Sequence, residues 1–397
     1  MAAYVLDWTA LLLRWLHFIT GVAWIGASFY FVWLDNSLRP PQDPALRDRG
    51  VGGELWAIHG GGFYNPQKYT LAPPELPAHL HWFKWEAYTT WLSGFGLLTV
   101  LYLMRPEQML IDPAVAPLLP WQAVVGVLGT MVVAWVVYDL LCRSPLGQRE
   151  GLLALVVFGL SVALAFGLSR FYAARAAYLL TGATLGTIMV ANVFFVIIPG
   201  QRALVGAMSR GEAPDPAPGK RAKQRSVHNN YFTLPVLFIM ISNHFAFTYG
   251  NAWGWLVLAI IMAAGVSIRH FFNLRHRGRV EWRYPALGVA LLLGAAVLGA
   301  PPVAAGGPDD RVVNVDKMRA LTILNTRCLP CHATKPTFTG VVAPPAGVRF
   351  DDPGEVVRNG PRALVQVQNR VMPLGNLTQM TEEERLVLLD WLAAGTP

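Results

Sequence analysis

Long runs of uncharged, apolar residues recur through most of this chain and constrain its fold more than any other feature. Hydrophobic residues make up 54% of the 397 positions and charged residues only 14%, a balance too apolar for a soluble protein of this length. Several runs reach the roughly 20 residues that a helix needs to cross a bilayer. The expected fold class is all-α, with a polytopic membrane helix bundle in a lipid bilayer. About eight spans are predicted, at 8–34, 82–104, 121–140, 151–169, 176–198, 232–250, 253–272 and 284–301.

The distribution of basic residues predicts how these spans are oriented. The formal net charge is +8, and a basic chain can also indicate a nucleic-acid partner. With the N-terminus placed outside, however, the outer loops carry only Arg105, Arg170 and Arg175. The inner loops carry Arg39, Arg47, Arg49, Lys68, Arg143, Arg149, Arg202, Arg210, Lys220, Arg221, Lys223, Arg225, Arg275, Arg277, Arg279 and Arg283. This bias follows the positive-inside rule. No nucleic acid is therefore predicted, and both the N-terminus and the C-terminal tail are expected on the periplasmic side of a bacterial inner (plasma) membrane.

A polar tail follows the last predicted span. The stretch from Ala300 to Val313 is rich in Pro, Gly and Ala, and residues 302–316 are predicted to form a linker. This divides the chain into a membrane domain, 1–301, and a C-terminal domain, 317–397. The tail contains Cys328, Cys331 and His332 in the order Cys-x-x-Cys-His, the attachment signature of c-type haem. In that motif the thiols join the porphyrin and the imidazole ligates the iron, so a covalent haem c is predicted. The alternatives are a redox disulfide or half of a zinc site, although a second cysteine pair is missing.

Two helices are expected to frame this motif, as in small c-type cytochrome domains. The first precedes it, with an apolar face at Met318, Leu321 and Leu324. The second begins with a capping box between Thr381 and Glu384. Gly395 is expected to end it.

The iron also needs a sixth ligand. Met372 is predicted for this role because it lies in the loop before the last helix, whereas its competitor Met380 abuts the helix cap. A thioether ligand raises the reduction potential of haem. The tail is therefore predicted to be an electron outlet for an oxidation carried out in the membrane part.

Two histidines are predicted to lie deep in the membrane. His17 falls within the first span and His244 within the sixth, both in the outer half. Ionisable side chains at such depth are costly and are candidates for function. His17 and His244 are therefore predicted to hold a second metal, such as the iron of a b-type haem. The alternative is that each bonds a neighbouring helix.

A resemblance to a known family is carried by four segments: WLHFITGVAWIGASFYFVWLDNSL, GGGFYNPQKY, LHWFKWEAYTTWLSGFG and HNNYFTLPVLFIMISNHFAFTYG. They resemble the integral-membrane urate oxidases, or urate hydroxylases, which join an eight-span membrane domain to a C-terminal cytochrome c domain. The resemblance covers essentially the whole chain. It implies oxidation of urate to 5-hydroxyisourate in purine breakdown, with electrons passed through haem c to a respiratory acceptor. A periplasmic cytochrome or a terminal oxidase would be that acceptor. The haem residues it implies are Cys328, Cys331, His332 and Met372.

Candidate substrate residues gather near the inner face. Urate is flat, anionic near neutral pH and rich in N–H and C=O groups, so its pocket needs an aromatic face, an amide and a cation. A general base is also required. The candidate catalytic residues are His81, Lys84, Glu86, His228 and Asn229. The segments FYNPQKY and HNNY supply further amides and rings; all of these could instead be interface anchors and helix caps.

Two other functions are compatible with the same pattern. An electron-transfer subunit would oxidise quinol or another dehydrogenase and would have no substrate pocket of its own. A transporter with a redox sensor tail would show broken helices or duplicated halves, and neither is evident in the sequence. Reduction of the haem by added urate would separate the enzyme from both.

Overall fold

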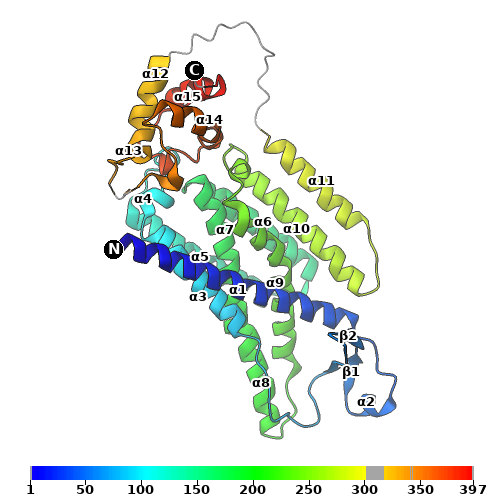
Figure 1. Cartoon of the computed structure of the whole chain (residues 1–397). Coiled ribbons are helices and arrows are strands. Elements are labelled where there is room, and N and C mark those ends of the chain that lie inside the picture. The colour runs from blue at the N-terminus through cyan, green and yellow to red at the C-terminus, as the bar shows by residue number, and fades with distance from the viewer. Residues whose placement is uncertain (1, 301–316, 340, 342, 396–397) are drawn as a thin grey trace.

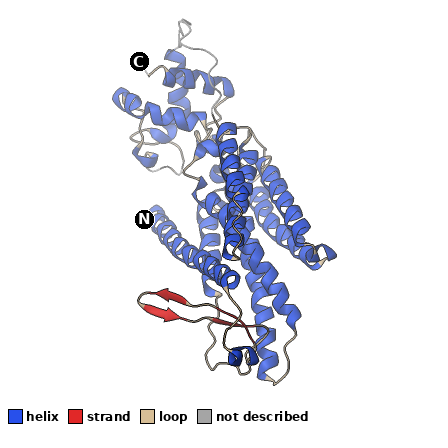
Figure 2. Ribbon diagram, turned by 90° about the vertical axis from the view of Figure 1, so that its right-hand side faces the viewer, coloured by secondary structure: helices blue, strands red, loops and turns tan. Residues whose placement is uncertain are grey.

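The computed structural model describes residues 2–300, 317–339, 341 and 343–395. The described chain is 71% helical with almost no sheet, which confirms the all-α prediction (Figures 1 and 2). The predicted linker, 302–316, lies outside the described residues. The helices form an elongated bundle, with the C-terminal helices at one end and the short strands at the other.

The bundle is built from helices within residues 2–300. They are α1 (Ala2–Ser37), α3 (Trp85–Leu98), α4 (Pro106–Met109), α5 (Pro120–Arg143), α6 (Glu150–Ser169), α7 (Ala174–Asn192), α8 (Ile198–Ser209), α9 (Pro216–Ser242), α10 (Gly254–His276) and α11 (Arg283–Leu298). Proline occupies the first helical position of α4, α5 and α9, and α9 also has a side-chain cap. At α9, Asp215 accepts a hydrogen bond from the Ala217 amide at 2.9 Å.

Among the described residues, five helices are long and apolar enough to cross a membrane: Tyr4–Ser37, Pro120–Arg143, Glu150–Ser169, Ala174–Ser209 and Gly254–His276. These coincide with five of the eight predicted spans. The remaining three regions are also helical. Residues 82–104 contain α3 and a π-helical turn, Thr99–Leu103, and 284–301 contains α11, which has 16 residues.

The predicted span at 232–250 is wrong at its C-terminal end. Helix α9 starts earlier, at Pro216, and ends at Ser242. The Ser242 hydroxyl donates to the Ile239 carbonyl at 2.7 Å, and short polar side chains of this kind compete with the helical hydrogen bonds. Apolar residues resume only after the Ser-Asn-His triplet, in a short 3-10 turn, Ala246–Thr248. Hydropathy alone therefore merged a helix with the loop that follows it.

Helices α7 and α8 form one continuous element around Pro199. The π-helical turn Val193–Ile197 lies directly before this proline. Proline has no N–H and its ring clashes with the carbonyl four residues earlier. A widened turn accommodates that clash, so the apolar element continues from Ala174 to Ser209.

Glycines bring three of the central helices into close contact. A Cβ on Gly182 of α7 would lie 2.4 Å from Ile239 of α9, and one on Gly265 of α10 would lie 3.3 Å from the Pro235 ring. Gly182 therefore allows α7 and α9 to approach closely within the bundle. As a result, α9 packs against α7 on one side and against α10 on the other.

The loop between α1 and α3, predicted as an inner loop, carries the few strands. It contains α2 (Pro44–Asp48), β1 (Val51–Glu54), β2 (Ala57–His59), β3 (Gly62–Tyr64) and β4 (Gln67–Tyr69). Strands β1 and β4 pair antiparallel, as do β2 and β3. Gly60 and Gly61 join β2 to β3 with φ of 57° and 81°, a region that favours glycine.

The tail forms a separate small helical core. It comprises α12 (Lys317–Ile323), a π-helical turn (Leu324–Cys328), α13 (Leu329–His332), α14 (Pro353–Gln368) and α15 (Glu382–Ala393). The capping box of Thr381 and Glu384 is confirmed, and Gly395 follows α15 with φ of 88°. The apolar face predicted for the first helix is wrong at Met318, which is 73% exposed; Ala320 and Ile323 are buried with Leu324 instead.

The tail packs beside α4 at the end of the bundle opposite the strands (Figure 1). A Cβ on Gly250 would lie 2.3 Å from the Asn369 carbonyl oxygen. Gly375, with φ of 56°, lies against the Glu107 and Gln108 carbonyls, each 3.1 Å from its Cβ position. Two glycines, one from each part, therefore permit this close approach.

Candidate functional site

His332 of the Cys-x-x-Cys-His motif is held by the backbone. Its Nδ1 lies 2.9 Å from the Val348 carbonyl oxygen. A carbonyl can only accept, so Nδ1 carries the proton and Nε2 keeps its lone pair. Metal-ligating histidines are commonly oriented by such a bond. Phe350 packs on the imidazole, with the ring centroids 5.6 Å apart.

The two cysteines of the motif precede this histidine, Cys328 at the end of the π-helical turn and Cys331 in α13. All three cysteines in the chain, each in a described position, are free. Burial raises the pKa of the Cys328 thiol to about 12 and also raises that of Cys331. An activated redox thiol needs the opposite shift. The donor set and its environment therefore fit haem attachment better than the redox disulfide.

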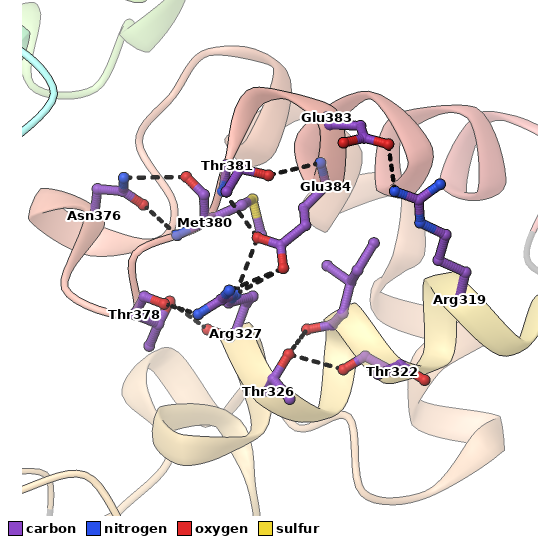
Figure 3. Close-up of polar contacts among 11 residues, drawn as sticks. Arg319, Thr322, Thr326, Arg327, Asn376, Thr378, Met380, Thr381, Glu383 and Glu384 are labelled. Carbon is purple, nitrogen blue, oxygen red and sulfur yellow. Dashed lines mark hydrogen bonds and ion pairs between the residues drawn. The ribbon is translucent and has the colours of Figure 1, made fainter.

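The two candidate methionines differ in their surroundings. Met380 is 3% exposed and packs in the tail core with Leu388 and Trp391. Its backbone is fixed at both ends by the Asn376 side chain, with contacts of 2.9 and 3.1 Å (Figure 3). Met372 is only half-buried and lies in the loop that meets the membrane part. These surroundings favour Met372 as the iron ligand, which stays a prediction.

An ion pair ties the haem-motif segment to the last helix. Arg327 donates to Glu384 at 2.8 Å and to the Thr378 carbonyl, while the Thr378 hydroxyl donates back to the Arg327 carbonyl at 3.0 Å (Figure 3). The hydrogen bond from Arg327 holds the pKa of Glu384 below its usual value. Glu384 also caps α15, so one carboxylate organises both helices.

The predicted pairing of His17 and His244 is weakened by where they lie. His17 is half-buried on α1, and its Nδ1 donates to the Thr90 carbonyl at 2.8 Å. Gly94 leaves room for the ring, since a Cβ there would lie 2.7 Å from it. His244 follows the end of α9 and is exposed, so its predicted depth inside a span is wrong. The metal-binding role of both residues stays a prediction.

The inner-face candidates fall into separate groups. His81 is exposed in the loop before α3 and lines a groove of about 900 Å³ with Tyr69, Trp82 and Gln201. Lys84 and Glu86 are half-buried at the start of α3, and the Lys84 ammonium lies 5.6 Å from the Trp85 ring centroid. This groove is therefore formed by the inner loop and α8.

Tyr69 of the segment FYNPQKY lines this groove, but Phe63, Tyr64, Asn65 and Gln67 are not among its lining residues. Phe63 and Tyr64 are 78% and 54% exposed on the β2–β3 hairpin. The Asn65 amide donates to Glu54 at 3.1 Å, and Gln67 donates to Asn65 at 2.9 Å. These amides instead fix the strand pairing.

His228 and Asn229 belong to a buried polar network between α5, α7 and α9. Arg225 donates to Asp139 at 2.7 Å and to the Asn192 oxygen at 3.3 Å. The Asn192 amide then donates to the Asn229 oxygen at 3.0 Å and to the Tyr138 hydroxyl at 3.1 Å.

Further members of this network are bonded as well. The Tyr138 hydroxyl lies 2.7 Å from His228 Nδ1, and the Asn229 amide donates to the Met189 carbonyl at 2.9 Å. Because Tyr138 accepts from Asn192, it donates to His228, whose Nδ1 is then the acceptor. We call this set of Tyr138, Asp139, Asn192, Arg225, His228 and Asn229 the closed network. Its bonds favour a role in holding the bundle together.

A second buried network lies on the other side of α9, against α10 and α1. Asn230, Arg269 and Asn273 are 0%, 5% and 7% exposed. The Asn230 oxygen accepts from Arg269 Nε at 2.8 Å and from the Asn273 amide at 3.1 Å. The Arg269 guanidinium carbon lies 3.8 Å from the ring centroid of Phe29 on α1.

The bonding capacity of this second network is not used up. Among the described residues, no hydrogen-bond partner is found for Asn230 Nδ2, Arg269 Nη2 or Asn273 Oδ1. These assignments follow from chemistry, because arginine only donates. The atom of Asn230 that faces Arg269 must therefore be the oxygen, and the Asn230 amide nitrogen points away from this contact. The same oxygen accepts from the Asn273 amide nitrogen, so the Asn273 oxygen is left without a partner. We call Asn230, Arg269 and Asn273 the open network.

Sequence reasoning missed Arg269 and Asn273. Asn230 belongs to the segment HNNY, whose residues the sequence places in one cluster. The available signal was a basic residue inside the apolar span 253–272, followed four residues later by an asparagine. That spacing places both side chains on one face of a helix, and a charge inside a span is a functional candidate by default.

Fold and site together define a class of protein: an all-α bundle with membrane-length helices, a buried arginine–amide site and a tail that fits haem c. The profile of the urate oxidase N-terminal family matches residues 3–300. The chain therefore belongs to this family, which indicates an oxidoreductase that acts on urate. Searches of curated proteins and of solved structures gave no match.

Proposed function

We propose that this protein is a membrane-bound urate hydroxylase that oxidises urate to 5-hydroxyisourate, with the electrons leaving through a covalently bound haem c. One observation carries the proposal. A single chain joins a urate oxidase family region, residues 3–300, to a tail with a Cys-x-x-Cys-His motif whose histidine is oriented to ligate iron. Cys328 and Cys331 would hold the haem, and His332 and Met372 would ligate it.

The reaction needs an electron acceptor and a route for protons. Urate and one water give 5-hydroxyisourate, two protons and two electrons. When bound, haem c supplies a one-electron acceptor. The chain's own contribution is to bind urate, to orient the attacking water and to accept protons. His81, Lys84, Glu86, His228 and Asn229 remain the proposed candidates for that chemistry; His228 has a bonded Nδ1, so Nε2 is the nitrogen available to it.

The contact between the two parts supports this electron path. The segment that carries Met372 lies against α4 and the loop after α9. A cavity of about 420 Å³ at this contact is lined by Tyr178, Tyr249 and Val371, among others. Electrons from the membrane part would therefore enter the tail on the Met372 side. We further propose that His17 and His244 hold a second metal or a haem b along the way.

The five membrane-length helices and the loop charges support a placement in the bacterial inner membrane. In this placement the tail is periplasmic, where it can reach a soluble cytochrome or a terminal oxidase. The strand-bearing loop faces the cytoplasm. The division into a membrane domain of 1–301, a linker of 302–316 and a cytochrome domain of 317–397 is part of the same proposal.

A visible spectrum tests the proposal. Purified protein with oxidised haem is mixed with urate in the absence of oxygen. The expected result is reduction of the c-type haem bands, and an additional b-type band would support the second site. Quinol is tested in parallel, and dithionite serves as the positive control for haem reduction. If quinol reduces the haem and urate does not, the chain is an electron-transfer subunit instead. Formation of peroxide in proportion to urate consumed would contradict the haem route.

A further inference from the structure

We propose that the open network of Asn230, Arg269 and Asn273 is the binding site for the urate anion. This inference rests on the proposed function and names the place where its substrate is held. Each of the three side chains is more than nine-tenths buried, and each has a polar atom with no partner among the described residues. Unpaired buried polar atoms are costly and indicate a ligand or a functional constraint.

The free atoms are of the donor and acceptor types that pair with an oxopurine edge. Arg269 Nη2 and Asn230 Nδ2 are donors, and Asn273 Oδ1 is an acceptor. An oxopurine presents carbonyl oxygens and a deprotonated ring nitrogen as acceptors, next to ring N–H donors. Two donors and one acceptor on mutually bonded side chains therefore fit this edge. An aminopurine such as adenine has no carbonyl for them.

Charge points to an anion. Arg225 of the closed network has Asp139 as its counter-ion, whereas Arg269 makes no ion pair with a carboxylate in the described parts of the chain. Its guanidinium contacts the Phe29 ring, which compensates a buried charge only in part. A bound anion would supply the missing partner, and a charge-assisted bond in a buried site is strong.

Polar residues at the inner ends of the same three helices mark a route to this site. Asp35 of α1 pairs with Lys68 of the inner loop and, at 3.2 Å, with Lys223 of α9. Arg277 of α10 donates to Asn36 of α1 at 2.9 Å. Residues of α1, α9 and the C-terminal end of α10 thus meet in a cluster with the basic side chains of Lys68, Lys223 and Arg277, which we call the basic cluster and which attracts anions.

The open network and the Phe29 ring lie at a similar distance from the basic cluster along each of the three helices. Phe29, Asn230 and Arg269 each lie six to eight residues along the chain from the members of this cluster on their own helix. At the rise of an α-helix this is about 9–12 Å. The three helices therefore bring an arginine, two amides and a ring to the same level, within reach of the cytoplasmic face.

The test measures urate binding without turnover. Full-length protein is reduced with dithionite under anaerobic conditions so that it cannot accept electrons, and radiolabelled urate is followed by equilibrium dialysis. Arg269→Gln is compared with Arg275→Gln, which removes the same charge from an exposed position of α10. We expect Arg269→Gln to weaken binding about 30-fold, as for loss of a bond to a charged group. Arg275→Gln should change it by less than about twofold.

A second variant keeps the test decisive if Arg269→Gln folds poorly. Asn273→Asp places a carboxylate four residues from Arg269 on the same helix face, where it can pair with the guanidinium. It should raise the melting temperature and abolish urate binding, because the carboxylate occupies the anion position.

The outcomes separate the site from the proposed function. Wild-type affinity in both variants would overturn the site even if urate still reduces the haem. Arg269-dependent binding without haem reduction would support the site and overturn the proposed function. Absence of urate binding to the wild-type protein would overturn both.

Discussion

Two arginine–amide networks flank α9 and differ in a single respect. In the closed network, Arg225 has a carboxylate partner and each amide bond leads to another protein group. In the open network, Arg269 has the Asn230 oxygen and a ring, and three polar atoms within the described structure remain without partners. Both arginines are nearly fully buried, at 3% and 5% exposure. Burial alone therefore does not distinguish them; satisfaction of hydrogen bonds does.

The difference teaches how a structural polar cluster is told apart from a binding site. A fully bonded network fixes neighbouring helices, and removal of one member leaves the others buried without partners. A network with free donors and acceptors is stabilised little by hydrogen bonds among its own members, and it can form further hydrogen bonds to a ligand. The two cases predict opposite responses to the same substitution.

The largest expected effect separates the arginines by stability. Arg225→Met should destabilise the protein by about 3 kcal/mol, since Asp139 stays buried after its partner is removed. This is the lower end for a buried pair, because Arg143 also reaches Asp139 at 2.6 Å. Thermal unfolding in detergent checks the value. A loss below about 1 kcal/mol would mean that the closed network does not hold the bundle together.

A smaller effect is expected from a neutral member of the closed network. Tyr138→Phe leaves the His228 nitrogen and one Asn192 hydrogen without their partner, at a cost of about 2 kcal/mol. The same unfolding measurement tests it. Equal stability of Tyr138→Phe and wild type would show that water replaces the hydroxyl and that the network is open to solvent.

The tail contains an ion pair that is partly exposed and therefore intermediate between a buried pair and a surface pair. Arg327 and Glu384 are 25% and 21% exposed in their side chains, so Glu384→Gln should cost about 1 kcal/mol. Because the folded pKa of Glu384 is lowered, its contribution is complete above the ordinary glutamate pKa and is lost as the pH falls through the lowered value. Acid unfolding of the tail, followed by the haem absorbance, should therefore shift less with pH in Glu384→Gln. An unchanged acid profile would remove Glu384 from this role.

The smallest effect on stability is expected at the open network. Arg269→Met removes a buried charge without a carboxylate partner, so its unfolding free energy should stay within about 1 kcal/mol of wild type. Its urate-dependent haem reduction should nevertheless be lost. A loss of stability as large as that of Arg225→Met would make the two networks equivalent and contradict the distinction.

Much of the fold was predictable because hydropathy and charge report directly on membrane helices. Five predicted spans match long helices, and the Thr381–Glu384 capping box and the turn at Gly395 follow from local chemistry. The end of α9 was not predictable in this way. Phe245, Phe247 and Tyr249 continue the apolar composition beyond Ser242, and hydropathy does not report where the backbone stops being helical.

The candidate site was less accessible to sequence reasoning. HNNY reads as one cluster, but successive helix positions point in different directions, so Asn229 faces α7 and Asn230 faces α10. The hydrogen-bond partners of these two amides come from residues about 40 positions earlier in the chain for Asn229 and about 40 positions later for Asn230. Periodicity identifies Arg269 and Asn273 as sharing a face, but only the packing at Gly265 and Pro235 shows what that face meets.

The most direct measurement is the change in melting temperature on adding urate to dithionite-reduced, full-length protein. A ligand that binds the folded state stabilises it by about 2.7 kcal/mol at a concentration of 100 times its Kd. Wild type should be stabilised by urate, whereas Arg269→Met should melt near the wild-type temperature without urate and show no shift when urate is added. An equal urate-induced shift in both proteins would contradict the central claim that the open network is where this protein holds its substrate.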